Sequence, residues 1–355
     1  MTVAKRSGDL PLWRLELTRG GKWGYIDRTG EFVIPPHFNC AFDFTEGLAG
    51  AISGKWGFID RTGEFVIPPQ FRRVRPFAEG LAPVCLEGYG WGAIDRTGQW
   101  VVPPQFENID MFSEGLAVAS FKGKKGYIDR TGRWVIPPQF EWAWKFSEGL
   151  AKVMFSFESS RLDCYGWIDR TGKLIIPPGS YFYPDFTRGD FKQGLAIVQH
   201  ILPQVKSWEY GYIGDDGHFR IQPQFDRGKD FSEGLAAVAE IKIYPLWRFL
   251  IHGLQKLFLK HQTSSSFGIE TFWGYIDPTG HLAIAHQFDD AKEFSEGLAA
   301  VKQGSKWGYI DRTGKLVIPY QFDDAGGFRN GLAVVWLHDR MHYIDRTGHI
   351  VTLRD

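Results

Sequence analysis

The chain has 355 residues, of which 43% are hydrophobic and 16% aromatic, so it holds enough apolar material for a large core. Lysine plus arginine and aspartate plus glutamate number 41 each, which leaves no net charge. Without a global electrostatic field the chain is not expected to bind nucleic acid in general, or to be drawn to anionic lipid.

Cysteine usage and hydropathy bear on the cellular compartment. Cys40, Cys85 and Cys164 lie far apart and fit neither a disulfide framework nor a zinc site. Residues 1–11 contain no apolar run of signal-peptide length, and no stretch approaches the roughly 20 apolar residues that a membrane-spanning helix needs. We therefore expect a soluble, cytoplasmic protein.

One short sequence recurs nine times. Residues 306–314 read Lys-Trp-Gly-Tyr-Ile-Asp-Arg-Thr-Gly, and residues 23–30 repeat this from the tryptophan onward. The position before the first glycine of this motif, or its replacement, is Trp23, Trp56, Trp91, Lys125, Tyr165, Tyr210, Trp273, Trp307 and Met341. The period is about 34 residues, and it lengthens between positions 125 and 273. A fixed period predicts one repeat domain over residues 1–355 instead of several unrelated domains.

Each repeat predicts three short strands. Residues 23–27 alternate as a strand does, and Asp-Arg-Thr-Gly at 27–30 is a turn in which the aspartate accepts from backbone amides. Residues 31–34 form the returning strand, which Pro35-Pro36 is expected to end. Glu-Gly then introduces a third strand of the type Leu-Ala-x-Val. One such unit is too small to bury its own face, so stacking of units must create the core.

The two ends of the chain differ in what they contain. The last unit, residues 343–351, has no Leu-Ala-x-Val strand after it, whereas an unassigned strand at residues 12–17 precedes the first unit. This predicts that the N-terminal strand completes the last repeat and closes a propeller-like ring. The alternative is an open, curved β-solenoid whose chain starts in the middle of a unit.

The repeated sequence resembles the bacterial WG-containing repeat (KWG repeat) proteins. The resemblance rests on Lys-Trp-Gly-Tyr-Ile-Asp-x-x-Gly, Val-Ile-Pro-Pro-Gln-Phe and Phe-Ser-Glu-Gly-Leu-Ala-x-Val, and it covers residues from about 12 to 355. It implies a β-rich repeat body from a bacterium, and no catalytic residue set comes with it. The chain departs from the motif at residues 214–216, where Gly-Asp-Asp replaces Asp-Arg-Thr, at Pro278, and at residues 341–342, where Met-His replaces Trp-Gly.

No pattern of residues predicts catalysis or metal binding. Each repeat turn offers a single aspartate, which favours turn capping over a calcium site with several converging oxygens. These aspartates are Asp27, Asp60, Asp95, Asp129, Asp169, Asp277, Asp311 and Asp345. The pairs Asp289-Asp290 and Asp323-Asp324 are adjacent on strands and so point to opposite faces. We expect no enzyme activity, no metal and no cofactor.

The largest departure from the repeat lies between Ile243 and Phe272. Residues 245–260 lose the alternation of a strand, and their apolar residues recur as on one face of a helix. That face comprises Trp247, Leu250, Ile251, Leu254, Leu257 and Phe258. An inserted amphipathic helix followed by a polar linker is therefore predicted over 243–272. The helix either packs on the repeat body, docks to a partner protein or lies at a membrane surface.

A second departure is the aromatic stretch at residues 179–186, which contains Tyr181, Phe182 and Tyr183. These rings either plug a locally wider core or form a contact surface, since aromatic residues are favoured at the centres of interfaces.

The sequence predicts a non-enzymatic protein–protein interaction scaffold whose irregular sector, residues 155–272, contacts an unidentified protein partner. The alternative is a glycan-binding module, which needs a row of exposed aromatic rings. The tryptophans at the start of the motif look more like an internal ladder: Trp23, Trp56, Trp91, Trp273 and Trp307. A second alternative is an enzyme whose pocket is assembled from several repeats.

Overall fold

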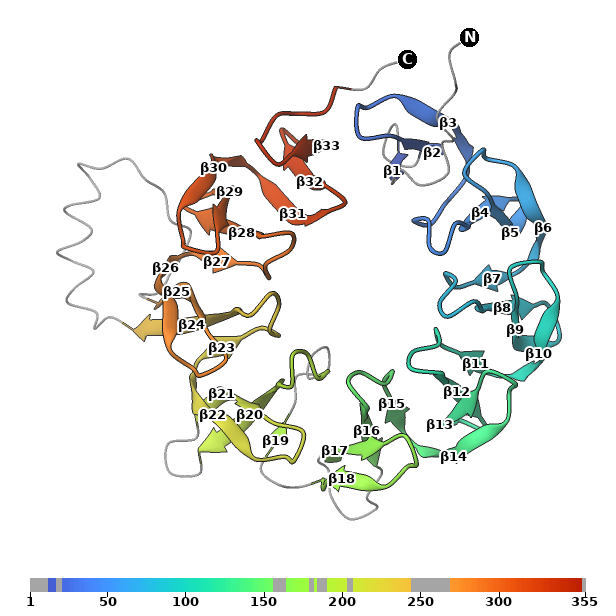
Figure 1. Cartoon of the computed structure of the whole chain (residues 1–355), viewed down its shortest axis with the longest axis horizontal. Coiled ribbons are helices and arrows are strands. Elements are labelled where there is room, and N and C mark those ends of the chain that lie inside the picture. The colour runs from blue at the N-terminus through green and yellow to red at the C-terminus, as the bar shows by residue number, and fades with distance from the viewer. Residues whose placement is uncertain are drawn as a thin grey trace, which may run out of the picture. The chain divides into compact units, whose positions relative to one another are not determined.

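A computed structural model describes residues 12–16, 21–155, 164–178, 182–183, 190–202, 207–243 and 269–352. Within these ranges all regular secondary structure consists of β-strands. The strands form nine antiparallel sheets, each built from one contiguous stretch of chain (Figure 1). We call these sheets blades 1 to 9 in chain order. Residues 1–179 with 352–355 form one unit, and residues 180–351 form the other.

The first unit contains blades 1 to 5. Blade 1 comprises β1 (Trp13–Glu16), β2 (Trp23–Ile26) and β3 (Phe32–Phe38), and blade 2 comprises β4 (Ala49–Ser53), β5 (Lys55–Ile59) and β6 (Phe65–Phe71). Blade 3 comprises β7 (Arg73–Val74), β8 (Ala82–Leu86), β9 (Gly90–Ile94) and β10 (Trp100–Phe106). Blade 4 comprises β11 (Asn108–Ile109), β12 (Leu116–Phe121), β13 (Lys124–Asp129) and β14 (Trp134–Phe140). Blade 5 comprises β15 (Trp142–Ala143), β16 (Leu150–Phe155), β17 (Cys164–Asp169) and β18 (Leu174–Ile176).

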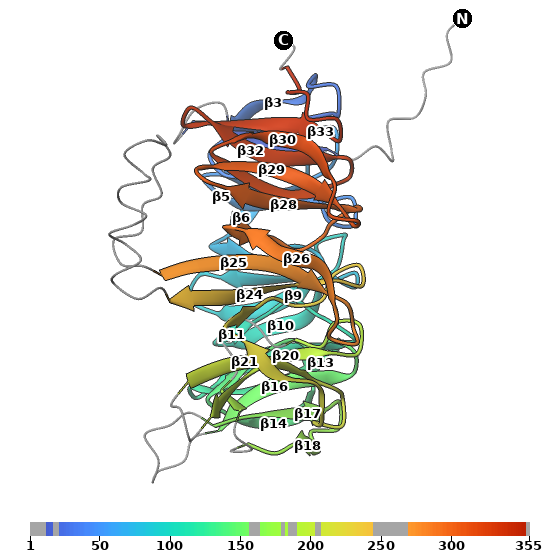
Figure 2. The same cartoon turned by 90° about the vertical axis from the view of Figure 1, so that its left-hand side faces the viewer.

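The second unit contains blades 6 to 9, which Figure 2 shows from the side. Blade 6 comprises β19 (Phe182–Tyr183), β20 (Ala196–Leu202), β21 (Ser207–Ile213) and β22 (Phe219–Phe225). Blade 7 comprises β23 (Arg227–Gly228), β24 (Ala236–Ile243), β25 (Ile269–Ile276) and β26 (Leu282–Phe288). Blade 8 comprises β27 (Asp290–Ala291), β28 (Leu298–Gln303), β29 (Lys306–Asp311) and β30 (Leu316–Phe322). Blade 9 comprises β31 (Asp324–Arg329), β32 (Leu332–Leu337) and β33 (Arg340–Asp345).

The Asp-Arg-Thr-Gly turn has the predicted capping role. In blade 8, Asp311 Oδ1 accepts hydrogen bonds from the Thr313 amide at 2.9 Å, the Thr313 hydroxyl at 2.6 Å and the Lys315 amide at 3.1 Å. Gly314 closes the turn with φ 84°, a conformation that glycine adopts without strain. The same aspartate–threonine bonds occur at Asp27, Asp60, Asp95, Asp129, Asp169, Asp277 and Asp345. The turn-capping prediction is confirmed.

Blade 6 keeps this turn although Gly214 replaces the aspartate. The amide of Gly217 donates to the Gly214 carbonyl at 2.9 Å, as the corresponding amides do in the other blades. Asp216 accepts from the His218 amide at 3.0 Å instead. The hairpin therefore rests on its backbone bonds and tolerates loss of the capping side chain.

The repeat unit read from the sequence is offset from the structural blade. Each Leu-Ala-x-Val strand pairs with the Trp-Gly strand that follows it, as β28 pairs with β29, and not with the hairpin before it. A short connection favours this partner, because neighbouring antiparallel strands need only a tight turn. In blades 3 to 8 a two-residue strand precedes these, so the predicted three strands become four.

The N-terminal strand follows the same rule. Trp13 of β1 lies opposite Ile26 of β2, in the register in which Ala299 lies opposite Ile310 in blade 8. Residues 13–16 thus form in blade 1 the strand that comes second in the four-stranded blades, which differs from the prediction that residues 12–17 complete the last repeat. Blade 9 likewise has its own strand of this type, β32.

The returning strand does not end at its prolines, contrary to the sequence-based prediction. In blade 8, Trp307 lies opposite Phe322 and Tyr309 lies opposite Ile318, so β30 places extra residues across from Gly308. The chain bows at this point, on the last strand of the sheet, where proline costs no ladder hydrogen bond. A Cβ on Gly308 would lie 2.6 Å from the Ile318 carbonyl oxygen, which explains the glycine of the Trp-Gly pair.

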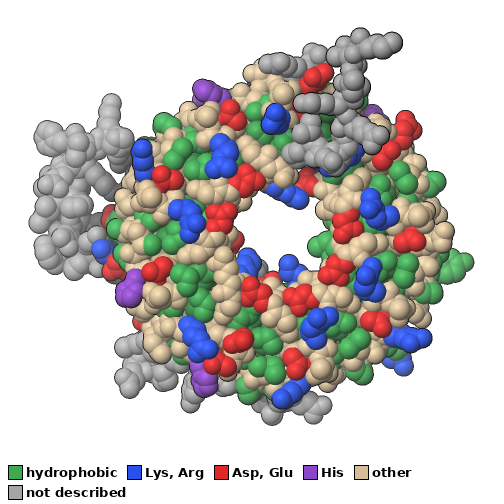
Figure 3. All heavy atoms as spheres, viewed as in Figure 1, with side chains coloured by type: hydrophobic (Ala, Val, Ile, Leu, Met, Phe, Trp, Pro, Cys, Tyr) green, Lys and Arg blue, Asp and Glu red, His purple; other side chains and the backbone are tan. Residues whose placement is uncertain are grey.

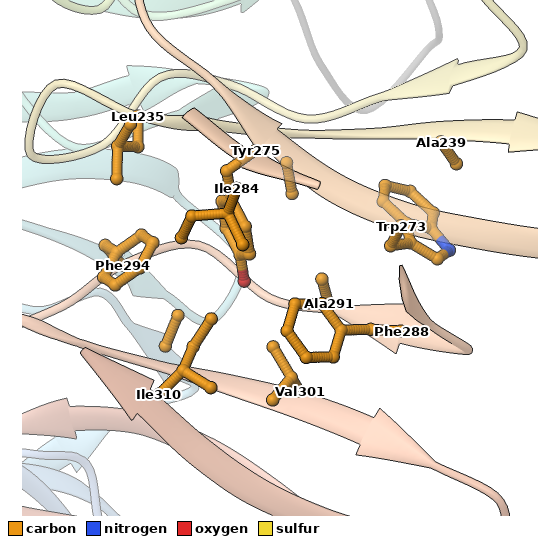
Figure 4. Packing of buried hydrophobic residues seen from close by; sticks show 12 residues of the cluster. Leu235, Ala239, Trp273, Tyr275, Ile284, Phe288, Ala291, Phe294, Val301 and Ile310 are labelled. Carbon is orange, nitrogen blue, oxygen red and sulfur yellow. The ribbon is translucent and has the colours of Figure 1, made fainter. Parts of the chain in front are cut away.

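The core lies between neighbouring blades of a unit, as stacking of repeats requires. Figure 4 shows the cluster between blades 7 and 8, where Tyr275 and Ile284 of one blade meet Phe294, Val301 and Ile310 of the next. Corresponding clusters join blades 1 to 5 in succession, and blades 6 to 9 likewise.

Polar contacts repeat along the same interfaces. The Tyr309 hydroxyl donates to the Gly326 carbonyl of the next blade at 2.8 Å. The Glu296 carboxylate accepts from the Gly331 amide of the next blade at 2.9 Å. The repeated tyrosine and glutamate therefore hold one blade to its neighbour.

The fold is an all-β repeat fold of nine blades, a β-propeller, and of the two predicted architectures the propeller-like one is supported. Closure of the ring between the two units stays a prediction. The described residues contain no helix, and the helix predicted within 243–272 falls on residues 244–268, outside the described part of the chain. No helix long and apolar enough to cross a membrane occurs among the residues described.

Candidate functional site

Most of the contact residues predicted from the sequence lie outside the described part of the chain. They are Tyr181, Trp247, Leu250, Ile251, Leu254, Leu257 and Phe258. Phe182 and Tyr183 form β19, which pairs with β20. Their role in binding a partner stays a prediction.

Three of the enlarged segments share one position in the blade. This position is the connection between the Leu-Ala-x-Val strand, which is the second strand of the blade, and the Trp-Gly strand that follows it. The three segments are residues 156–163 in blade 5, 203–206 in blade 6 and 244–268 in blade 7. In blade 2 the same connection is the single residue Gly54. The ends of β24 and β25 that border the longest insertion point to the left in Figure 2. In blades 6 and 7 the two strands that border this connection are also longer: β20 and β21 have 7 residues each and β24 and β25 have 8, against 6 in β28 and β29 of blade 8.

The first unit also contains a groove that the repeat pattern does not predict. Its volume is about 390 Å³, within the range typical of ligand sites. Its lining comes from blades 2, 3 and 4: Phe42, Trp56, Arg73, Val74, Arg75, Trp91 and Asn108. We call it the tryptophan–arginine groove.

Aromatic rings form one end of this groove. Phe42 and Trp56 of blade 2 stack with ring centroids 4.5 Å apart and planes 24° from parallel. Both side chains are partly exposed. Trp91 of blade 3 is only 8% exposed and lies deeper, with the Arg75 guanidinium 5.2 Å from its ring centroid. The groove thus offers a stacked, partly solvated aromatic surface beside a buried ring.

Arg75 is held rigidly beside Trp91. Its Nε donates to the Ile109 carbonyl at 2.8 Å, and its Nη2 donates to Asn108 Oδ1 at 3.0 Å. The same Nη2 lies 2.7 Å from Asp110 Oδ1. Arg75 therefore bridges blades 3 and 4, and its charge is compensated by Asp110.

Unlike Arg75, the Arg73 side chain is neither held by hydrogen bonds nor compensated by a carboxylate among the described residues. Its side chain is exposed and lines the groove, and it makes no hydrogen bond or ion pair with any of the described residues. Its backbone is fixed, because β7 pairs with β8 with Arg73 opposite Cys85. The groove consequently contains one guanidinium group without a compensating carboxylate from the described chain.

In the second unit, lysines stand at the position that Arg75 has in blade 3. Lys229 lies 4.9 Å from the Trp273 ring centroid and donates to the Ala291 carbonyl of the next blade at 2.6 Å. Lys292 lies 4.7 Å from the Trp307 ring centroid and pairs with Asp324 at 3.0 Å. These cations cover a tryptophan and are compensated by the neighbouring blade. Phe42 takes this position in blade 2, which places a ring where those blades have a cation.

A sequence signal for the groove does exist. Residues 72–75 read Arg-Arg-Val-Arg, where the same segment reads Glu-Asn-Ile-Asp at 107–110 and Asp-Asp-Ala-Lys at 289–292. Comparison of the repeats position by position would have found this reversal of charge. On the face shown in Figure 3, basic and acidic side chains are interspersed over the blades of each unit, so any excess of positive charge there is local.

No group of three or more histidine, cysteine, aspartate or glutamate side chains suited to hold a metal ion occurs within the described ranges.

The family model of the WG containing repeat matches the chain eight times and covers more than half of it. The matched stretches are residues 23–52, 56–89, 91–124, 126–155, 165–200, 210–240, 273–307 and 307–335. The chain belongs to the WG-containing-repeat family. This confirms the resemblance seen in the sequence, while a bacterial origin stays a prediction. The ninth WG copy, at residues 341–342, lacks the Trp-Gly pair and is not matched.

No curated protein matches this WG-repeat chain. Among solved structures it is similar to a crystal structure of the eukaryotic initiation factor, with a TM-score of 0.62, 9% identity, and coverage of 96% of this chain and 95% of that one. The computationally designed Ika8 protein gives a TM-score of 0.42 at 10% identity, covering 85% of this chain and 94% of that one. BamB from Moraxella catarrhalis gives 0.41 at 9% identity, covering 84% and 93%. At such identities a likeness concerns the fold alone.

Proposed function

We propose that the protein is a non-enzymatic scaffold that binds another protein, with the enlarged connections between residues 155 and 272 as a contact region. The observation that carries this proposal is the placement of three insertions at one connection of the blade. Repeat proteins commonly bind partners through insertions gathered on one face. The repeat fold of the WG family is in keeping with such a role.

The conserved pattern within the chain supports the same proposal. The repeated aspartates cap turns, the repeated tyrosines and glutamates join blades, and the Trp-Gly glycines admit a crossing backbone. These residues already have structural roles. Specific recognition is therefore left to segments in which the repeats differ from one another.

The test is capture of partners from the native lysate by the intact chain and by a chain lacking residues 245–262. We expect the shortened chain to keep its unfolding temperature and to lose the partner. A chain in which residues 245–262 are scrambled, with their composition retained, is the matched control and should also lose it. Equal recovery by all three would place the contact elsewhere, and failure of the intact chain to recover any protein would refute the scaffold function.

The burial of the motif tryptophans bears on the glycan-binding alternative. Trp91, Trp273 and Trp307 are 8%, 6% and 5% exposed, while Trp23 and Trp56 are partly exposed. Three of these five tryptophans are too buried to belong to a row of exposed rings. We therefore do not advance glycan binding as a second function. An enzymatic role likewise has no specific observation in its favour, and the cytoplasmic location stays a prediction.

A further inference from the structure

We propose that the tryptophan–arginine groove binds an extended, acidic segment of a partner protein. In this complex a carboxylate of the segment pairs with Arg73, and a neighbouring apolar side chain packs against Phe42 and Trp56. The inference names the partner chemistry of the proposed scaffold function and rests on that function. It concerns a different surface from the insertions between residues 155 and 272.

Charge complementarity favours an anionic group. The Arg73 guanidinium is exposed at the groove and has no carboxylate partner among the described residues. Guanidinium groups bind carboxylates through two parallel hydrogen bonds, which combine affinity with directional specificity. Within the groove Arg73 is the one cation left to fill this role, because Arg75 is already paired with Asp110.

The same arrangement favours a carboxylate over a phosphate. A phosphate monoester carries a charge of about −1.5 to −2 at neutral pH. The groove offers one uncompensated positive charge, and the Asp110 carboxylate beside Arg75 would repel a second negative charge. A side-chain or C-terminal carboxylate matches this balance.

The aromatic wall favours an apolar neighbour for that carboxylate. Phe42 and Trp56 are stacked and partly exposed, so contact with an apolar side chain removes ring surface from water. Tryptophan and arginine are also the residue types that dominate binding energy at interfaces. Arg75 is already held in place through three contacts, so this part of the groove needs no further ordering on binding.

The span of the groove favours a chain segment over a small acid. Its lining runs from Phe42 in blade 2 through Arg73 in blade 3 to Asn108 in blade 4. An extended segment presents side chains at regular intervals along such a surface.

The test begins with selection of random ten-residue displayed peptides on the intact protein. We expect enriched peptides to carry Asp or Glu within three residues of an aromatic or large aliphatic residue. Synthetic, fluorescein-labelled copies of the enriched peptides are then titrated against variants, with anisotropy as the readout. Arg73→Glu should weaken binding by about tenfold or more, equivalent to about 1.4 kcal/mol.

Two matched controls separate a specific effect from a general one. Arg72→Glu changes the same charge on the adjacent residue, which is exposed but does not line the groove, and should leave binding unchanged. Trp56→Ala should weaken binding by about tenfold. Trp142→Ala removes a ring that is 55% exposed and outside the groove, and should have no effect. The unfolding temperature of each variant shows whether its fold is retained.

Several results would overturn the proposal. These are no enrichment relative to a selection on Arg73→Glu, enrichment of basic peptides, or equal affinity of the selected peptides for Arg73→Glu and the unchanged protein. Binding of indole-3-acetate or inorganic phosphate with the same Arg73 dependence, and as tight as the peptides, would assign the groove to a small anion. If lysate capture succeeds while the peptide selection fails, the scaffold function stands and the groove assignment alone falls.

Discussion

At the residue scale, the Trp-Gly glycines are fixed by a backbone that passes over them. In blade 8 the bowed strand β30 brings the Ile318 carbonyl to the place where a Cβ of residue 308 would be. The Trp-Gly pair can be recognised in the sequence, but its reason cannot, because the crossing depends on extra residues in a different strand.

The first prediction compares two glycines of the same blade. Gly308→Ala should lower the free energy of unfolding by about 2–3 kcal/mol, since the added methyl would meet backbone atoms that cannot rotate away. Gly304→Ala places its methyl in open space and should cost about 1 kcal/mol, from φ 61° alone. Urea unfolding curves measure both. Equal losses would contradict this explanation of the Trp-Gly glycine.

The second prediction concerns the capping aspartates and acid. The hydrogen bond from the Thr313 hydroxyl holds the pKa of Asp311 below its ordinary 3.8, and the pKa values of the other seven capping aspartates are lowered as well. A lowered folded-state pKa contributes stability that is present above pH 3.8 and lost as the pH falls through the folded value. The urea midpoint should therefore be steady from pH 7 to 5 and decrease below about pH 4.

Asp311→Asn isolates one of these groups. The variant should be less stable than the unchanged protein at pH 7, and the difference should shrink as the pH falls below 3.8 and Asp311 itself becomes protonated. A difference that is constant with pH would show that the ionised form of Asp311 adds nothing to the turn.

At the element scale, the Glu-Gly turn has a role in the neighbouring blade. Glu296 and Gly297 have φ values of 54° and 79°, which is the two-residue hairpin geometry that favours glycine or asparagine. Glutamate is retained there while its carboxylate accepts from the Gly331 amide of the next blade. In blade 6, Gln193 makes the corresponding bond to the Gly234 amide at 2.9 Å.

The third prediction uses this natural substitution as its control. Glu296→Ala should reduce the free energy of unfolding by about 1–2 kcal/mol, because the partly buried Gly331 amide loses its acceptor. Glu296→Gln should cost less than about 0.5 kcal/mol, because an amide oxygen can replace the carboxylate. Thermal unfolding of both variants provides the comparison. Equal destabilisation would mean that charge, and not the hydrogen bond, matters at this position.

Elements of different length were predictable to different degrees. The Trp-Gly strand and the Asp-Arg-Thr-Gly turn follow from alternation and turn chemistry, which are local. The two-residue strand Asn108–Ile109 has no local signal, and it exists because β12 offers a free edge. The assignment of Leu116–Phe121 to the following hairpin depends on pairing across a turn, which a repeat length cannot reveal.

At the scale of the whole molecule, each blade is stabilised mainly by its neighbours within a unit. The clusters at successive interfaces make the stability of such an array a sum of blade terms and nearest-neighbour terms. The groove belongs to this scale, since Phe42, Arg73 and Asn108 come from three blades. Sequence reasoning missed the groove because it searched for residues that the repeats share, and the arginine-rich segment at residues 72–75 occurs in one repeat.

The fourth prediction tests this nearest-neighbour picture. Phe294→Ala removes a ring that is 1% exposed from the interface of blades 7 and 8, and should cost about 3–5 kcal/mol. Amide hydrogen exchange should accelerate most in those two blades and least in blades 1 to 3. Uniform acceleration along the chain would instead indicate that all nine blades unfold as one cooperative body.

The offset between sequence repeat and blade has a consequence for how such a chain can change during evolution. A matched stretch such as residues 91–124 starts at the Trp-Gly strand of one blade and ends after the second strand of the next, so its boundary falls at the connection that also carries the insertion at 244–268. Duplication or deletion of one such stretch splits a blade and restores it from the new copy, leaving every sheet with its full set of strands. The connection that carries the insertions is thus also the connection at which whole blades can be gained or lost.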